Sequence, residues 1–172
     1  MKQFSNLPHI NLKNHYQFIT FRTYESIDNY VKKVQNYSLK DNIKQYKIDS
    51  YLDNSLNGSY FFNEYIDIMK NVLLEHDKSL YNLVAFCIMP NHIHMLIKQI
   101  ESLDTIMQRV KGKSAYILNQ KLNKKGKFWA NGYYDKVIRD KEQYITTIEY
   151  ILNNPIKANL KDYKQRVYCI YN

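Results

Sequence analysis

Two histidines stand out in the sequence as residues that could bind a metal ion. His92 and His94 are two positions apart in HIHMLIKQ (92–99), a segment with the pattern of a β-strand. Alternate residues of a strand project from the same face, so the two imidazoles would lie roughly 6 to 7 Å apart, close enough to share one ion. Ile93 and Met95 would then face the core. The tripeptide alone is not specific, and a pair of solvent-facing or hydrogen-bonded histidines is the alternative interpretation.

Tyr150 is a candidate nucleophile in a predicted helix from 142 to 153. At 100° per residue, one stripe of this helix would face the core, formed by Tyr144, Ile145, Ile148, Ile151 and Leu152. Tyr150 lies roughly opposite this stripe, and Asn154 follows one turn later on the same side. The pattern therefore predicts that Tyr150 points away from the packing layer. A surface tyrosine in a tyrosine-rich chain is the alternative.

Tyrosine can attack a phosphodiester if a cation lies nearby. A free phenol has a pKa of about 10, and the negative charge of the phosphodiester repels an anionic nucleophile. A metal ion held by His92, His94 and the amide oxygen of Asn154 would neutralise that charge and orient the phosphate. The oxygen ligand suits Mg²⁺ or Mn²⁺ and the imidazoles favour Mn²⁺, with zinc as the alternative. Because ligating imidazoles are neutral, activity is expected to fall below about pH 6 to 6.5.

A basic segment downstream of the histidines could bind a nucleic-acid strand. The chain has 25 Lys and Arg against 16 Asp and Glu, a net charge of +9, which favours a polyanionic partner. The predicted DNA-binding residues combine positive charge with an aromatic ring and are Arg109, Lys111, Lys113, Lys124, Lys125 and Trp129. Lys121, Lys127 and Phe128 belong to the same stretch. The alternatives are a solvated charged face and, for Phe128 and Trp129, a cap on the core.

The predicted elements must bring these residues together. Patterns typical of strands occupy 16–24, 82–89, 92–99 and 133–139. Patterns typical of helices occupy about 61–73, 103–122 and 142–153, the last stopped by Pro155. The order indicates an α+β fold, a ferredoxin-like antiparallel sheet packed on helices, with a C-terminal helix that carries Tyr150.

The chain length predicts a single domain over 1–172. Residues 1–14 read as an irregular leader, and residues 26–56 read as a helical insert after the first strand. Cys87 and Cys169 form no CxxC pair, so neither a structural zinc site nor a disulfide framework is indicated. No signal-peptide pattern or bilayer-length apolar run occurs, so a cytoplasmic protein without a membrane partner is expected.

Three blocks of sequence resemble the REP-associated tyrosine transposases of the HUH single-tyrosine transposase superfamily. They are MPNHIHMLI (89–97), FWANGYYDKVIRD (128–140) and EYILNNPIKANL (149–160), in the same order and with the same spacing. The similarity extends through FITFR (18–22), YLDNSLNG (51–58) and SLDTIMQRVKGKSA (102–115), and so covers most of the chain. Agreement over several blocks is far more specific than any one motif.

The resemblance implies a metal-dependent transposase. By position, His92 and His94 match the metal-binding HUH pair, Tyr150 matches the nucleophile, and Asn154 matches the polar residue that completes the metal site. Family members cleave single-stranded DNA hairpins of repetitive palindromic elements through a 5′-phosphotyrosine, and reverse attack by a 3′-hydroxyl gives strand transfer. The chain ends in KQRVYCIYN without the tryptophan-bearing tail of many relatives, which puts hairpin recognition by that tail in doubt.

Two other functions share these residues. One is a non-catalytic, domesticated protein that only binds single-stranded nucleic acid, and the other is a nuclease of replication or conjugation. The intact His92, His94 and Tyr150 favour the transposase, acting in the cytoplasm on the nucleoid as a monomer or homodimer. Tyr133 and Tyr134 lie nearby, but their predicted strand and their spacing to Asn154 favour packing or DNA stacking.

Overall fold

An antiparallel sheet forms the centre of the molecule. The computed structural model describes residues 12–171, so most of the expected leader lies outside the described residues. The strands are β1 (Tyr16–Arg22), β2 (Tyr81–Ile88), β3 (His92–Gln99), β4 (Tyr134–Ile138) and β5 (Val167–Cys169). Their order across the sheet is β4-β1-β3-β2-β5, and every neighbouring pair is antiparallel. The strand that carries both histidines is therefore the central one.

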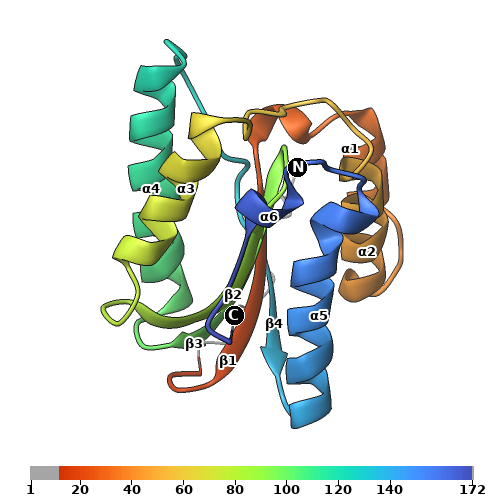
Figure 1. The fold of residues 1–172 in the computed structure, drawn as a ribbon. Helices are drawn as coiled ribbons and strands as arrows, with labels where there is room; N and C mark the ends of the chain where they lie inside the picture. Colours follow the sequence, from red (N-terminus) through yellow and green to blue (C-terminus); the bar gives the residue numbers. More distant parts are fainter. Residues whose placement is uncertain (1–11, 172) are drawn as a thin grey trace.

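Helices cover both faces of the sheet (Figure 1). On one face lie α3 (Glu64–Glu75) and α4 (Leu103–Lys121), and on the other lies α5 (Lys141–Lys157). Two further helices, α1 (Asn29–Gln35) and α2 (Asp41–Leu52), pack against each other, and Asp49 of α2 contacts Tyr150 of α5. The short elements are η1 (Tyr24–Ser26) and α6 (Tyr163–Arg166). The β1-α3-β2-β3-α4-β4 succession confirms the expected ferredoxin-like α+β class.

Alternation along β3 separates the core from the candidate site. Ile93, Met95 and Ile97 are buried in the larger hydrophobic cluster, together with side chains of α3 and α4. His92 and His94 have the opposite parity and therefore face the side of α5. Neighbouring strands fix the position of His94, which pairs with Thr20 on β1 and with Cys87 on β2. The sequence prediction for this strand is confirmed to the residue.

The C-terminal helix departs from its predicted end and orientation. It continues through Pro155 to Lys157, so the expected stop at Pro155 is wrong. The missing N–H removes only one helical bond, and the last turn keeps bonds from Ala158 to Asn154 and from Leu160 to Pro155. Ile145, expected in the core stripe, is 45% exposed. Helix α5 is therefore rotated about its axis, so that part of its polar side faces the sheet.

The segment after Pro155 adds structure that the sequence pattern did not predict. Strand β5 pairs with the outer edge of β2, and α6 precedes it. Arg166 is fully buried, and its guanidinium donates to the Asp162 carboxylate and to the Ile88 carbonyl oxygen, the latter at 2.9 Å. These bonds give the buried charge the partners that it needs and hold the C-terminal segment against β2.

The helical insert has a small core of its own, formed by Val31 and Val34 of α1 and Ile48 and Leu52 of α2. Asp28 caps α1 by accepting hydrogen bonds from the backbone N–H groups of Tyr30 and Val31. The prediction of helices between 26 and 56 is confirmed by α1 and α2. We call α1 and α2 with their connection the α1–α2 insert.

Candidate functional site

The two histidines converge in the middle of the sheet. Both side chains are fully buried, and their Nε2 atoms lie 3.1 Å apart. The outer nitrogens have partners, since His92 Nδ1 lies 2.8 Å from Asn91 Oδ1 and His94 Nδ1 lies 2.7 Å from Thr20 Oγ1. An amide oxygen only accepts, so His92 donates from Nδ1 and its Nε2 carries the lone pair that a metal requires.

Tyr150 lies against the histidines from α5. Its ring is edge-on to that of His94, with centroids 5.3 Å apart, and to that of Phe18, with centroids 5.8 Å apart. The phenol donates a long hydrogen bond of 3.4 Å to Asp49 Oδ2. The expectation that Tyr150 points away from the packing layer is wrong, because the sheet beneath α5 is itself polar at this point. The structure brings the proposed nucleophile and metal ligands together.

Asn154 follows Tyr150 by one helical turn and is buried. Its side-chain nitrogen has no hydrogen-bond partner in the described part of the chain. Buried amide groups are normally paired, so this N–H donor is suited to an acceptor such as a phosphate oxygen, whereas a metal ion would bind the amide oxygen. Its role as a metal ligand stays a prediction.

Two carboxylates near the histidines were missed in the sequence. Asp49 of α2 offers a ligand atom that lies, with those of His92 and His94, within 4.8 Å of one another. Asp53, one turn later, has an oxygen 3.6 Å from His92 Nε2. The available signal was a pair of acids four residues apart in the α1–α2 insert, which would share one helix face. Nothing in the local pattern indicated that this face turns toward β3.

Burial keeps both imidazoles neutral. It lowers the pKa of His94 to about 3, with a smaller contribution from the Arg22 cation. It also lowers the pKa of His92 well below its usual value, with help from His94 and Arg22. Proton competition at these histidines therefore begins far below pH 6, which corrects the expectation of a decline at pH 6 to 6.5.

Burial has the opposite effect on the acidic groups. It raises the pKa of Asp49 to about 8 against the attraction of Arg22, and raises that of Asp53 to about 6. The pKa of the Tyr150 phenol is also raised, chiefly by burial and then by Asp49. A divalent cation would favour the charged form of all three groups. Neutral imidazoles and a nearby buried carboxylate oxygen together fit a divalent metal ion.

The raised pKa of Asp49 predicts how the stability of the metal-free protein changes with pH. The folded-state value of about 8 lies above the ordinary 3.8, so the stabilising contribution of the protonated acid is lost as pH rises through 8. In EDTA, the free energy of unfolding measured with urea should fall by about 2 kcal/mol more in the unmodified protein than in Asp49→Asn between pH 6.5 and pH 9. Parallel curves for the two proteins would contradict this assignment.

Thr20 is expected to support metal binding through His94. Replacement by the isosteric valine removes the 2.7 Å contact to His94 Nδ1 and leaves the ring without its orienting partner. We expect Mn²⁺ affinity to fall about 10- to 100-fold by isothermal titration calorimetry. Thr146→Val on the exposed face of α5 is the matched control and should bind as the unmodified protein does. Equal affinity in both variants would remove Thr20 from the site.

The predicted DNA-binding residues do not gather at the histidines. Arg109, Lys111 and Lys113 lie on α4, which covers the opposite face of the sheet (Figure 1). Lys113 pairs with Glu75, and Lys124 pairs with Glu25. Lys111 donates to the carbonyl oxygens of Ala130 and Gly132 at 2.7 and 2.9 Å. Arg109 and Lys125 are exposed.

Trp129 is a core residue. Its side chain is 6% exposed, and its indole nitrogen donates to Ser114 Oγ at 3.0 Å. Phe21 and Phe61 pack against its ring. The prediction that Trp129 stacks on DNA is therefore wrong, because no face of the ring is open, and the alternative of a core cap is correct for Phe128 as well.

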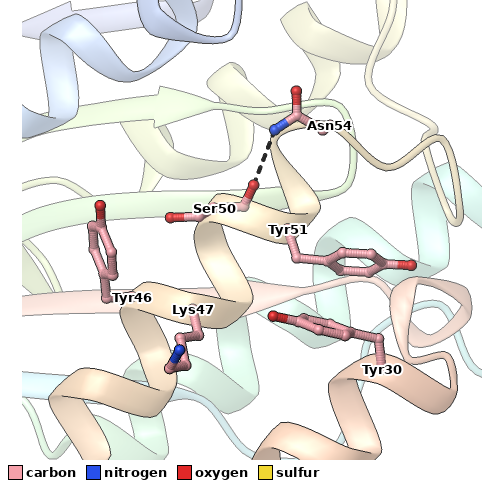
Figure 2. A pocket seen from close by; sticks show the side chains of 6 residues that line it. All are labelled: Tyr30, Tyr46, Lys47, Ser50, Tyr51 and Asn54. Carbon is pink, nitrogen blue, oxygen red and sulfur yellow. Dashed lines mark hydrogen bonds between the residues drawn. The ribbon is translucent and has the colours of Figure 1, made fainter.

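The outer side of the α1–α2 insert carries a hollow of about 470 Å³ (Figure 2). Its lining residues are Tyr30, Tyr46, Lys47, Ser50, Tyr51 and Asn54. Figure 2 shows the rings of Tyr30 and Tyr51 lying over one another, with centroids 4.4 Å apart. Neither histidine nor Tyr150 lines it. Helix α2 thus turns this side outward and its Asp49 side toward the sheet.

A helix long and apolar enough to cross a bilayer does not occur between residues 12 and 171.

The chain matches a known family over most of this site. A family model described as "Transposase IS200 like" matches residues 50–154, a range that includes both histidines, Tyr150 and Asn154 and begins directly after Asp49. No curated protein sequence matches. The fold is similar to a REP-associated tyrosine transposase solved bound to a REP hairpin, with a TM-score of 0.51, 15% identity, and coverage of 90% of this chain and 74% of that one. A structure described as a transposase from Deinococcus radiodurans has a TM-score of 0.40 and 15% identity, over 87% of this chain and 97% of that one.

Proposed function

Because the chain belongs to the IS200-like transposase family, we propose that it cleaves and rejoins single-stranded DNA hairpins through a covalent bond to Tyr150. The observation that carries this proposal is the contact between the Tyr150 ring and His94, which lies beside His92 in a buried, polar site. A lone surface tyrosine would have no such neighbours. A protein that only binds DNA would have no need for this arrangement.

The proposed reaction exchanges one phosphodiester for another. The phenolic oxygen of Tyr150 bonds to phosphorus, the bond from phosphorus to O3′ breaks, and O3′ leaves with a proton as a free hydroxyl. The 5′-phosphate then remains on Tyr150. Attack by a 3′-hydroxyl reverses these steps and joins the strand to a new end, which is strand transfer.

The side chains around Tyr150 prepare this step. His92 and His94 would hold a divalent ion, Mg²⁺ or Mn²⁺, with the amide oxygen of Asn154 as a further ligand. When bound, the ion supplies Lewis-acid stabilisation of the charge that develops on the phosphate. Asn91 and Thr20 keep the two rings oriented, and Phe18 packs beside both His94 and Tyr150. The phenol is thereby held beside the ligands before DNA arrives.

The substrate proposal rests on the family and on the charge of +9. The related transposase solved with a REP hairpin makes a DNA hairpin of repetitive palindromic elements the first substrate to test. Exposed Arg109 and Lys125 are candidates for phosphate contacts with the flanking strand. We place the activity in the cytoplasm, on nucleoid DNA.

Mapping the covalent product tests the proposal. The protein is incubated with Mn²⁺ and a labelled single-stranded hairpin, denatured in detergent and digested with trypsin. Mass spectrometry should find a nucleotide on the peptide that contains Tyr150, and EDTA should abolish it. A nucleotide on Tyr133 or Tyr134 would overturn the assignment. Hairpin binding without any covalent product would favour the domesticated DNA-binding protein.

A further inference from the structure

Helix α2 of the α1–α2 insert presents one polar stripe to the histidines. Gln45, Asp49 and Asp53 are spaced by four residues, so they lie one above another on the same face. Gln45 and Asp49 are buried, and the Gln45 amide donates to Asp49 Oδ1 at 2.6 Å. Ile48 and Leu52 occupy the neighbouring stripe, which packs in the core of the insert. The apolar packing of α2 therefore fixes the direction in which Asp49 points.

The spacing between Asp49 and the histidines suits one shared ion. The three ligand atoms all lie within 4.8 Å of one another. Two ligand atoms on opposite sides of an ion, each about 2.1 Å from it, are about 4.2 Å apart. Small side-chain movements would therefore bring all three ligand atoms within bonding distance of one ion. The bond from Tyr150 to Asp49, at 3.4 Å, is long for a hydrogen bond between two oxygens. Oδ2 of Asp49 is therefore only weakly engaged, while Oδ1 accepts from Gln45.

Among the described residues, neither Asp49 nor Asp53 forms an ion pair with a lysine or arginine, although Arg22 attracts Asp49 and Lys157 attracts Asp53 from farther away. Buried carboxylates need a positive partner or a full set of donors. Asp53 Oδ1 is buried without a hydrogen-bond partner in the described chain, yet it lies 3.6 Å from His92 Nε2. Arg22 is near enough to influence Asp49, but its Nη1 is also buried and unpaired. An ion between the histidines would add a positive charge in direct reach of Asp49.

Asn91 links the insert to the histidines mechanically. Its side-chain amide lies 3.1 to 3.3 Å from three carbonyl oxygens, those of Leu52, Ser55 and Asn57, and can donate to them. Its Oδ1 accepts from His92. One side chain therefore sets both the end of α2 and the orientation of a metal-binding ring. This arrangement holds Asp49 in register with the two imidazoles.

We propose that Asp49 is a protein ligand of the divalent ion, so that α2 completes a centre of two imidazoles and one carboxylate. This inference rests on the proposed function, since it concerns the same ion. Asp49 lies on α2, so this ligand would belong to the insert. The α1–α2 insert is then a part of the active site.

Mn²⁺ titration of the full chain tests the inference. Asp49→Asn and Asp49→Ala should each weaken Mn²⁺ binding at least about tenfold by calorimetry or electron paramagnetic resonance. The matched control is Asp41→Asn, which makes the same change at the first residue of the same helix, where the side chain is 49% exposed. That control should bind as the unmodified protein does. Circular dichroism melting verifies that each variant is folded.

The failures of the two proposals are distinguishable. Unchanged Mn²⁺ affinity in both Asp49 variants would overturn the inference. The proposed function would still stand if the adduct formed on Tyr150 and depended on His94. A higher adduct yield in Asp49→Asn at unchanged Mn²⁺ affinity would also overturn the inference. It would indicate that the Asp49 carboxylate occupies the position that the DNA phosphate takes in the reaction. An unmodified protein that neither binds Mn²⁺ nor forms the adduct would overturn both.

Discussion

Replacement of Tyr150 by phenylalanine is expected to abolish the covalent DNA adduct. The change removes only the attacking oxygen, and loss of a nucleophile typically lowers the rate by at least about a thousandfold. Phe18 and His94 would still contact the ring, and the hydrogen bond lost is the long one to Asp49. Stability should therefore change by less than about 1 kcal/mol. The measurement is adduct yield on denaturing gels with Mn²⁺ and labelled hairpin DNA.

Tyr134→Phe is the matched control for this experiment. Tyr134 is half-buried on the same face of the sheet, and its ring centroid is 6.4 Å from that of Phe18. Tyr133 packs with the other core, where its hydroxyl donates to Asp104. The Tyr150 ring, by contrast, lies edge-on to that of His94. Loss of the adduct in Tyr134→Phe with retention in Tyr150→Phe would move the nucleophile to β4.

Replacement of His94 by glutamine is expected to remove both metal binding and adduct formation. Glutamine fills a similar volume but cannot place an imidazole nitrogen beside His92 Nε2. His94 is fully buried between Thr20 and Tyr150, so the change removes one of the two imidazole ligands and leaves His92 alone. Mn²⁺ affinity should fall by at least about 100-fold, and no adduct should form at saturating DNA.

His15→Gln provides the comparison. His15 is exposed, and its Nδ1 contacts the backbone oxygen of Lys13. The same chemical change at His15 should leave both the Mn²⁺ affinity and the adduct yield unaltered. If His94→Gln kept the adduct while its Mn²⁺ affinity fell, the cleavage would not depend on the ion. That result would remove the metal from the proposed reaction.

The strand and the two histidines could be predicted from the sequence because they depend on local alternation. Along β3 a period of two residues places His92 and His94 on one face whatever packs above them. Helical periodicity also singled out Tyr150, the resemblance then supported it as the nucleophile, and the fold class followed from the order of the elements. These features need no knowledge of how distant segments meet.

The carboxylates could not be predicted because their role depends on packing between distant segments. Asp49 reaches the histidines only because Ile48 and Leu52 fix the rotation of α2 and Asn91 holds its end. Trp129 was misassigned for a related reason. Basic neighbours suggested a DNA-binding surface, whereas its ring fills a space between Phe21 and Phe61 that only the folded chain creates. The helix through Pro155 likewise depends on packing that outweighs one missing bond.

The separate core of the α1–α2 insert has a consequence for access to the buried histidines. Only a few side chains of the insert are buried together, apart from both cores of the sheet. Units with little apolar contact open at a lower free energy than central strands, as hydrogen exchange detects. Amides of α1 and α2 should therefore exchange before those of β3. Such opening would let a DNA strand reach a centre that is sealed when the insert is docked, without unfolding the sheet.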